Sequence, residues 1–274
     1  MIITEAEYYE AEAAFKSGHY TLAEEKCRQY LQILSGSDRT INTEERILLA
    51  NFSRLLADVF VQLHKTSEAL PYAEQSLQIG REVQNTNIEA RAHRILGVIH
   101  GERTKKKKAM ECFHQALSMY EASNRKDGVS LTLSNIGLVY QMQSNYPMSL
   151  QYLNQALAMD EELGSDEGIA RNLGNIGTVY AYLSEYPNAL EKFQKALEIT
   201  ERLGLKRSIA INLSNIGSIY QVLSDYPRAE ECFHQALALH SELNQKDGIA
   251  FALGNIGVIK HAQSQHESAL EYYR

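Results

Sequence analysis

The chain has 274 residues, of which 44% are hydrophobic and 22% are charged, and this balance is too apolar for a disordered protein. The formal net charge is −7, so we do not expect the basic surface that nucleic-acid binding requires. No run approaches the roughly 20 apolar residues that span a bilayer, and the N-terminal segment is acidic where a signal peptide is basic. We therefore expect a cytoplasmic protein with no membrane partner.

An internal repeat dominates the sequence. Four segments share the central pattern Asn-Ile-Gly and start at Leu131, Arg171, Ile211 and Phe251, each 40 residues after the one before. A period between about 20 and 50 residues indicates a solenoid, a propeller or another array of stacked units.

In chain order, the pattern predicts six full repeats and a seventh that is cut short. The approximate bounds are 4–49, 50–89, 90–129, 130–169, 170–209, 210–249 and 250–274, within a single domain over residues 1–274. The first repeat keeps the frame only if six residues are inserted before the second, and the polar segment from Ser35 to Glu45 is the expected place. The cut seventh repeat predicts a fragment of a longer protein, and the alternative is a homodimer formed through this uncapped end.

Each repeat has the pattern of two helices. In the fourth, Leu133 and Ile136 lie in the first helix and Leu150 and Leu153 in the second, at the step of three that places side chains on one helical face. One such pair cannot bury its apolar face alone, but stacked copies can. The expected fold class is therefore all-α.

The helix ends also repeat. A proline that suits the first helical turn starts the second helix at Pro147, Pro187 and Pro227. Residues that tolerate the left-handed conformation after a helix follow the second helices at Asn124, Gly164, Gly204 and Asn244.

These residues resemble the tetratricopeptide repeat (TPR) family. The family order of apolar residue, Leu-Gly, Tyr, Ala, aromatic residue and Ala is matched in the fifth repeat by Leu173, Ile176-Gly177, Tyr180, Ala189, Phe193 and Ala196. The period is 40 residues where about 34 is usual, which is similar to LGN/Pins adaptors, kinesin light chains and bacterial Rap-type arrays. The resemblance implies a right-handed superhelical α-solenoid whose first helices line a concave groove.

The resemblance places four asparagines in that groove. They are Asn135, Asn175, Asn215 and Asn255, at one position of four successive repeats. An amide side chain offers both a donor and an acceptor to a peptide bond, so we expect peptide-binding contacts here. Gln141 and Gln221 lie further along the same helices and would add contacts. The alternative is that the asparagines bond neighbouring helices inside the array.

A row of arginines is the second candidate. It consists of Arg54, Arg91, Arg94 and Arg171. Guanidinium groups bind carboxylates in pairs, so the row predicts a partner with acidic side chains or a free C-terminal carboxylate. The alternative is internal pairing, for example with Asp58 or Glu89.

Residues for catalysis or metal binding are not evident. The nine histidines and three cysteines lack metal-ligand spacing, and the odd cysteine count argues against a disulfide framework. No P-loop, GxGxxG or GxSxG motif occurs, so we expect no cofactor, no metal and no enzymatic activity. The run Lys105–Lys108 is expected in the turn between two helices as a solvated loop, with a weak contact to an acidic group as the alternative.

The sequence thus predicts a non-catalytic scaffold that binds a protein or peptide. The first alternative is a sensory or regulatory arm of a larger bacterial signalling protein, whose effector would be a nucleotide cyclase, a histidine kinase or a transcription regulator outside this chain. A structural spacer or oligomerisation arm is the second alternative.

Overall fold

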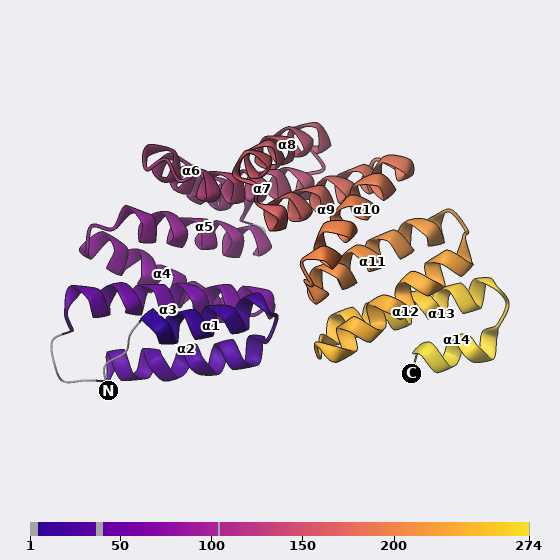
Figure 1. Cartoon of the computed structure of the whole chain (residues 1–274), viewed down its shortest axis with the longest axis horizontal. Coiled ribbons are helices and arrows are strands. Elements are labelled where there is room, and N and C mark those ends of the chain that lie inside the picture. Colours follow the sequence, from indigo (N-terminus) through magenta and orange to yellow (C-terminus); the bar gives the residue numbers. More distant parts are fainter. Residues whose placement is uncertain (1–4, 37–40, 104, 274) are drawn as a thin grey trace. The chain divides into compact units, whose positions relative to one another are not determined.

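The structure is a computed structural model that describes residues 5–36, 41–103 and 105–273. Within these residues the chain forms fourteen α-helices and no strand (Figure 1), which confirms the expected all-α fold of helix pairs. The helices are α1 (Glu5–Lys16), α2 (Tyr20–Ser35), α3 (Thr43–Gln62), α4 (Thr66–Glu82), α5 (Thr86–Glu102), α6 (Lys106–Ala122), α7 (Lys126–Met142), α8 (Tyr146–Leu163), α9 (Asp166–Tyr182), α10 (Tyr186–Arg202), α11 (Lys206–Val222), α12 (Tyr226–Glu242), α13 (Lys246–Ala262) and α14 (His266–Tyr273).

These helices belong to two compact units. Unit 1 comprises Met1–Asn145 with α1 to α7, and unit 2 comprises Tyr146–Arg274 with α8 to α14. The boundary falls between α7 and α8, inside the fourth repeat. That both units form one continuous solenoid stays a prediction. None of the helices in the described chain combines the length and the apolar character of a membrane-spanning segment.

Within each unit, the first helices of successive repeats contact one another, whereas the described second helices do not. Within a unit every helix packs against its neighbours in sequence, and alternate first helices also touch: α1, α3, α5 and α7 in unit 1, and α9, α11 and α13 in unit 2. No two second helices of the described chain make such a contact. The first helices of each unit therefore lie closer together than the second helices do. The unit curves toward its first helices, and the faces of the first helices that point away from the second helices form its concave surface.

Short turns fix this antiparallel stacking. The turns of unit 2 hold three residues each, for example 183–185 and 203–205, except for the two-residue turn 164–165 between α8 and α9. The residues predicted to follow the second helices, Asn124, Gly164, Gly204 and Asn244, all have a positive φ, as expected. Four serines, Ser144, Ser184, Ser224 and Ser264, take the same conformation after the first helices, a feature that the sequence pattern did not reveal.

In two repeats a phenylalanine ring of the second helix packs directly against a glycine of the first helix. A Cβ atom on Gly97 would lie 2.5 Å from the Phe113 ring, and one on Gly177 would lie 2.9 Å from the Phe193 ring. Both rings are almost fully buried. The glycine that recurs at this position of the first helix, after Leu96 and after Ile176, therefore permits the close approach of the two helices within a repeat.

Two details differ from the expected turns. The lysine run was expected in a loop, but α6 begins at Lys106, so three of its four lysines form the first helical turn and only Lys105 precedes it. Lys106 Nζ donates a hydrogen bond to the Met142 carbonyl (2.8 Å), which ties this turn to the end of α7. Of the predicted insertion, residues 37–40 lie outside the described residues, while Thr43–Glu45 already belongs to α3.

A buried histidine makes the stability of unit 1 depend on pH. His93 of α5 lies in the core, and its Nδ1 has no hydrogen-bond partner among the described residues. Burial, assisted by the positive charge of Arg81, lowers the pKa of His93 below its ordinary value of 6.5. The unfolded chain then binds more protons than the folded chain between the lowered pKa and 6.5, so the free energy of unfolding falls as the pH falls through that window.

The His93→Gln variant is expected to lose this part of the pH dependence. Urea unfolding of wild type, of His93→Gln and of His114→Gln, which changes an exposed histidine of α6, measures the free energy of unfolding at several pH values from about 7.5 down to about 5. The His93→Gln variant should give a flatter profile than the other two proteins. Three parallel profiles would show that His93 does not carry the effect.

Candidate functional site

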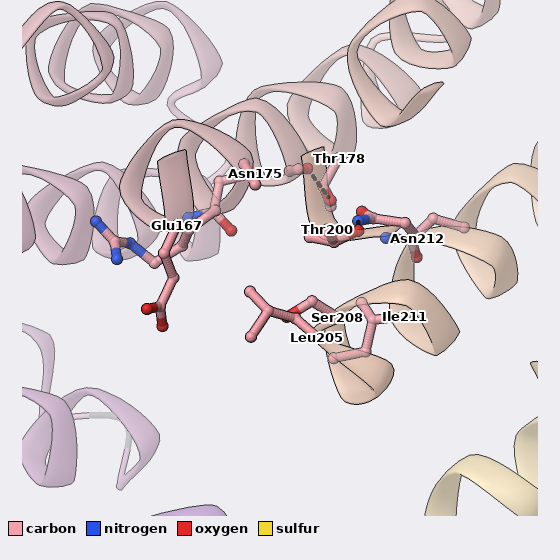
Figure 2. A pocket seen from close by; sticks show the side chains of 12 residues that line it. Glu167, Asn175, Thr178, Thr200, Leu205, Ser208, Ile211 and Asn212 are labelled. Atoms are coloured by element: carbon pink, nitrogen blue, oxygen red, sulfur yellow. Dashed lines mark hydrogen bonds between the residues drawn. The ribbon is translucent and has the colours of Figure 1, made fainter. Parts of the chain in front are cut away.

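A polar cavity lies between the first helices of unit 2. It has a volume of about 280 Å³ and is walled by α9 on one side and α11 on the other (Figure 2). Thr200, near the end of α10, and Leu205, in the turn that follows, complete the lining. On α9 the lining residues recur at steps of three and four, as on one face of a helix. The cavity therefore lies on the face of the first helices that carries the predicted binding residues of unit 2.

Two of the four predicted asparagines meet in this cavity. Asn175 of α9 and Asn215 of α11 both line it, from equivalent positions of successive repeats. Neither side-chain amide makes a hydrogen bond to another residue of the described chain, and both side chains are half-buried. A partly buried amide without a partner keeps its donors and its acceptor available to a ligand.

The other two asparagines lie elsewhere. Asn255 Nδ2 donates to the Phe251 carbonyl of its own helix α13 (2.8 Å). Asn135 belongs to α7 in unit 1, and its Nδ2 is buried without a hydrogen-bond partner among the described residues. The structure therefore brings Asn175 and Asn215 to one cavity and shows different surroundings for Asn135 and Asn255.

Two other asparagines, one helical turn before Asn175 and Asn215, make the side-chain contacts between neighbouring helices. Asn172 Nδ2 donates to Asp160 Oδ2 (2.7 Å), and Asn212 Nδ2 lies 3.5 Å from Thr200 Oγ1. Both residues are buried. Neither residue was among the predicted site residues, although they too lie 40 residues apart, because the period alone does not say which face of a helix is covered by its neighbours.

Arg171 lines the cavity as half of an ion pair. Its Nη2 lies 3.1 Å from Asp160 Oδ2, and Asp160 is only 3% exposed. The carboxylate comes from α8 and neutralises the guanidinium from within unit 2. For Arg171 the structure thus shows internal pairing, one of the two alternatives that the sequence left open.

Arg54 is paired inside unit 1. It is 7% exposed, its Nη2 donates to the Tyr8 hydroxyl (2.6 Å), and its Nη1 contacts the Asp58 carboxylate. Burial opposes its charge, but the attraction of Asp58, with those of Tyr8 and Glu12, raises the pKa of Arg54 above its ordinary value. The structure therefore shows the internal pairing of Arg54 with Asp58. Glu89, the other acid considered as an internal partner of the arginine row, lies instead near Arg81, with 3.9 Å between Glu89 Oε2 and Arg81 Nε.

Arg91 and Arg94 join Arg54 in a basic cluster of unit 1. Arg94 Nη2 lies 3.8 Å from Asp58 Oδ1, an acid that already contacts Arg54, and Arg91 has no carboxylate partner among the described residues. Burial raises the pKa of the Tyr120 hydroxyl, and the positive charges of Arg94, Arg91 and Arg54 act in the opposite direction. The positive charges of all three arginines therefore act on this one tyrosine, whereas Arg171 belongs to unit 2.

The remaining candidates lie outside the cavity. Gln141 Oε1 of α7 is buried without a hydrogen-bond partner among the described residues, and Gln221 of α11 does not line the cavity.

The described residues contain no group of three or more His, Cys, Asp or Glu side chains that could hold a metal ion. All three cysteines are free thiols, and burial raises the pKa of the Cys27 thiol to about 12.

The fold is shared with several solved structures. RapI in its apo form is 20% identical, with 98% of this chain and 94% of that chain covered and a TM-score of 0.66. Aspartyl phosphate phosphatase F from Bacillus subtilis is 19% identical over 97% of this chain and 67% of that chain, with a TM-score of 0.69. NprR in complex with its cognate peptide NprX is 15% identical over 98% and 76%, with a TM-score of 0.62.

Sequence comparison gives the family. No curated protein matches the sequence. The family model of the tetratricopeptide repeat, however, matches residues 47–122, 128–202 and 208–274, which is most of the chain. These segments contain the helix pairs that follow α1 and α2, including nearly all of the two helices that line the cavity. The chain therefore belongs to the tetratricopeptide repeat family.

Proposed function

We propose that the chain is a non-catalytic, cytoplasmic scaffold that binds an extended peptide segment of a partner protein along the first helices of unit 2. One observation carries the proposal: the free amides of Asn175 and Asn215 lie at equivalent positions of neighbouring helices and share one cavity. Such a pair can hold a peptide backbone without selecting its side chains, because every peptide bond offers the same donor and acceptor.

The spacing of the helices suits an extended ligand. Packed helices lie about 8 to 10 Å apart, and an extended chain rises roughly 3.3 Å per residue. Successive first helices would therefore meet about every third residue of the peptide. Asn255 on α13 continues the series, since its bond to the Phe251 carbonyl uses one amide hydrogen and leaves the side-chain oxygen free to accept.

Two further observations support a peptide as the ligand. NprR, which shares the fold, was solved with its cognate peptide. In unit 1, Arg91 lacks a carboxylate partner among the described residues, and Arg94 has only a share of Asp58. We propose that these two arginines contact an acidic side chain or a free carboxylate of a partner, while Arg54 holds the cluster in place from its buried position.

Replacing both cavity asparagines is expected to weaken peptide binding. A net hydrogen bond contributes about 1 kcal/mol, so Asn175→Ala combined with Asn215→Ala should raise Kd roughly 30-fold. The ligand is a fluorescein-labelled peptide selected from a random library on the wild-type protein, and fluorescence anisotropy measures Kd. Asn154→Ala, an exposed asparagine of α8 outside the cavity, is the matched control and should bind as wild type does. Equal affinity of the double variant and the control would contradict the proposal.

A further inference from the structure

One position near the end of the second helix differs between repeats. It carries Tyr120, Asp160, Thr200 and His240, 40 residues apart, and all four are buried. Eight residues later, in the next first helix, three repeats have glycine and one has Ser208. The position therefore lies where a second helix meets the following first helix.

In three repeats the side chain fills this junction. A Cβ atom would lie 2.3 Å from the Tyr120 ring if placed on Gly128, 2.3 Å from the Asp160 carboxylate if placed on Gly168, and 2.4 Å from the His240 ring if placed on Gly248. The larger side chain thus occupies the space that glycine leaves.

The junction with Thr200 is different. Thr200 and Ser208 both line the cavity instead of packing a large group against a glycine. Gly174 also lines it and contributes no side chain. The cavity therefore exists because this repeat has a small side chain at a position where the other three have a tyrosine, an aspartate and a histidine.

The lining has two kinds of surface. Leu205 and Ile211 supply apolar groups, and Figure 2 shows Leu205, Ser208 and Ile211 across the cavity from Glu167 of α9. Asn175, Asn215 and Thr178 supply amide and hydroxyl oxygens that can accept hydrogen bonds. An aliphatic stem with a polar end fits this combination better than a purely apolar side chain does.

The charge of the lining is unbalanced. Arg171 is neutralised by Asp160, as described above. Glu167 is exposed and has no ion-pair partner among the described residues. One carboxylate therefore remains for a cation that enters the cavity, and charge-assisted hydrogen bonds to such a group are stronger than neutral ones.

We infer that this cavity is a side-chain subsite, kept open by the Thr200–Ser208 pair, that accepts a lysine or arginine side chain of the bound peptide. The inference rests on the proposed function, since it places one side chain of the peptide whose backbone the asparagines hold. The stem of the basic residue lies against Leu205 and Ile211, and its charged end reaches Glu167.

Two labelled peptide pools test the subsite. Both are random nonapeptides with a fluorescein label, and the central residue is lysine in one pool and norleucine, which has a similar stem without the charge, in the other. Anisotropy titration of wild type should show about tenfold tighter binding of the lysine pool, as expected for one charge-assisted hydrogen bond. Glu167→Gln should abolish that preference, and the control Glu198→Gln, an exposed acid of α10 outside the cavity, should keep it.

A second variant closes the cavity. Thr200→Tyr with Ser208→Gly copies the Tyr120–Gly128 pair into this junction, so the packing already exists in the molecule. It should bind both pools with equal affinity. If this variant fails to fold by circular dichroism, Glu167→Gln decides, because it changes only an exposed side chain.

The outcomes separate the two claims. Equal binding of both pools by wild type, together with weaker binding of both by the Asn175→Ala, Asn215→Ala double variant, would overturn the subsite and leave the proposed function standing. Persistence of the lysine preference in Glu167→Gln would likewise overturn the subsite. Failure of both pools to bind wild type would overturn both claims.

Discussion

Replacing Asp58 by asparagine is expected to lower the free energy of unfolding by about 3 to 5 kcal/mol. Asp58 contacts the buried guanidinium of Arg54 and lies 3.8 Å from Arg94. Removing its charge leaves the guanidinium of Arg54, which is only 7% exposed, with Glu12 at 3.9 Å as its remaining acidic partner among the described residues. A buried charge without its partner costs far more than a surface pair contributes.

Urea unfolding followed by circular dichroism measures this loss. The matched control is Asp166→Asn, which breaks the surface pair between Asp166 and Arg202 (2.9 Å), whose side chains are 41% and 62% exposed. That change should cost less than about 1 kcal/mol. A loss in Asp58→Asn no larger than in Asp166→Asn would show that Arg54 does not depend on its internal partner, and Arg54 would return as a candidate ligand contact.

Removing the Phe193 ring is the second change with a large expected effect. Phe193 is 2% exposed, packs in a cluster with Ala189, Ile216 and Ile219, and lies directly against Gly177. Truncating a buried phenylalanine to alanine typically costs about 3 to 5 kcal/mol, because the transfer energy is lost and a cavity remains. The contact spans three helices, so we expect α9, α10 and α11 to lose stability together.

The control for this prediction makes the same chemical change at an exposed position. Phe251 of α13 is 48% exposed, so Phe251→Ala should cost much less than Phe193→Ala. Unfolding midpoints of both variants, and hydrogen exchange of the amides of α9 to α11, provide the measurement. Similar losses for the two variants would contradict the assigned role of the Ile-Gly contact.

The repeat made much of the fold predictable. A period of 40 residues fixed the helix pairs, and residue type at the helix ends foretold the positive φ of Asn124 and Gly164. It also placed Asn175 and Asn215 at equivalent positions, and the structure shows both in one cavity. These features depend on local sequence that each repeat copies, so the pattern alone contains them.

What the sequence did not reveal depends on contacts between repeats. Arg54 has a groove position by register, yet it is buried, and its guanidinium donates a hydrogen bond to the hydroxyl of Tyr8, which lies 46 residues earlier on α1. The cavity depends on the space that the small side chains of Thr200 and Ser208 leave between the helices, and the repeat pattern does not predict how much space remains there. The division into two units between α7 and α8 likewise follows from the distribution of packing contacts, which the regular repeat hides.

Photo-crosslinking tests the central claim most directly. Benzoylphenylalanine is introduced at Thr178, on the wall of the cavity, or at Asn154, on the second helix α8, and each protein is irradiated with a peptide selected from a random library on wild type. Mass spectrometry then identifies the crosslinked residues. A groove that holds a peptide along the first helices of unit 2 predicts crosslinking from position 178 and none from position 154. Crosslinking from position 154 alone would contradict it.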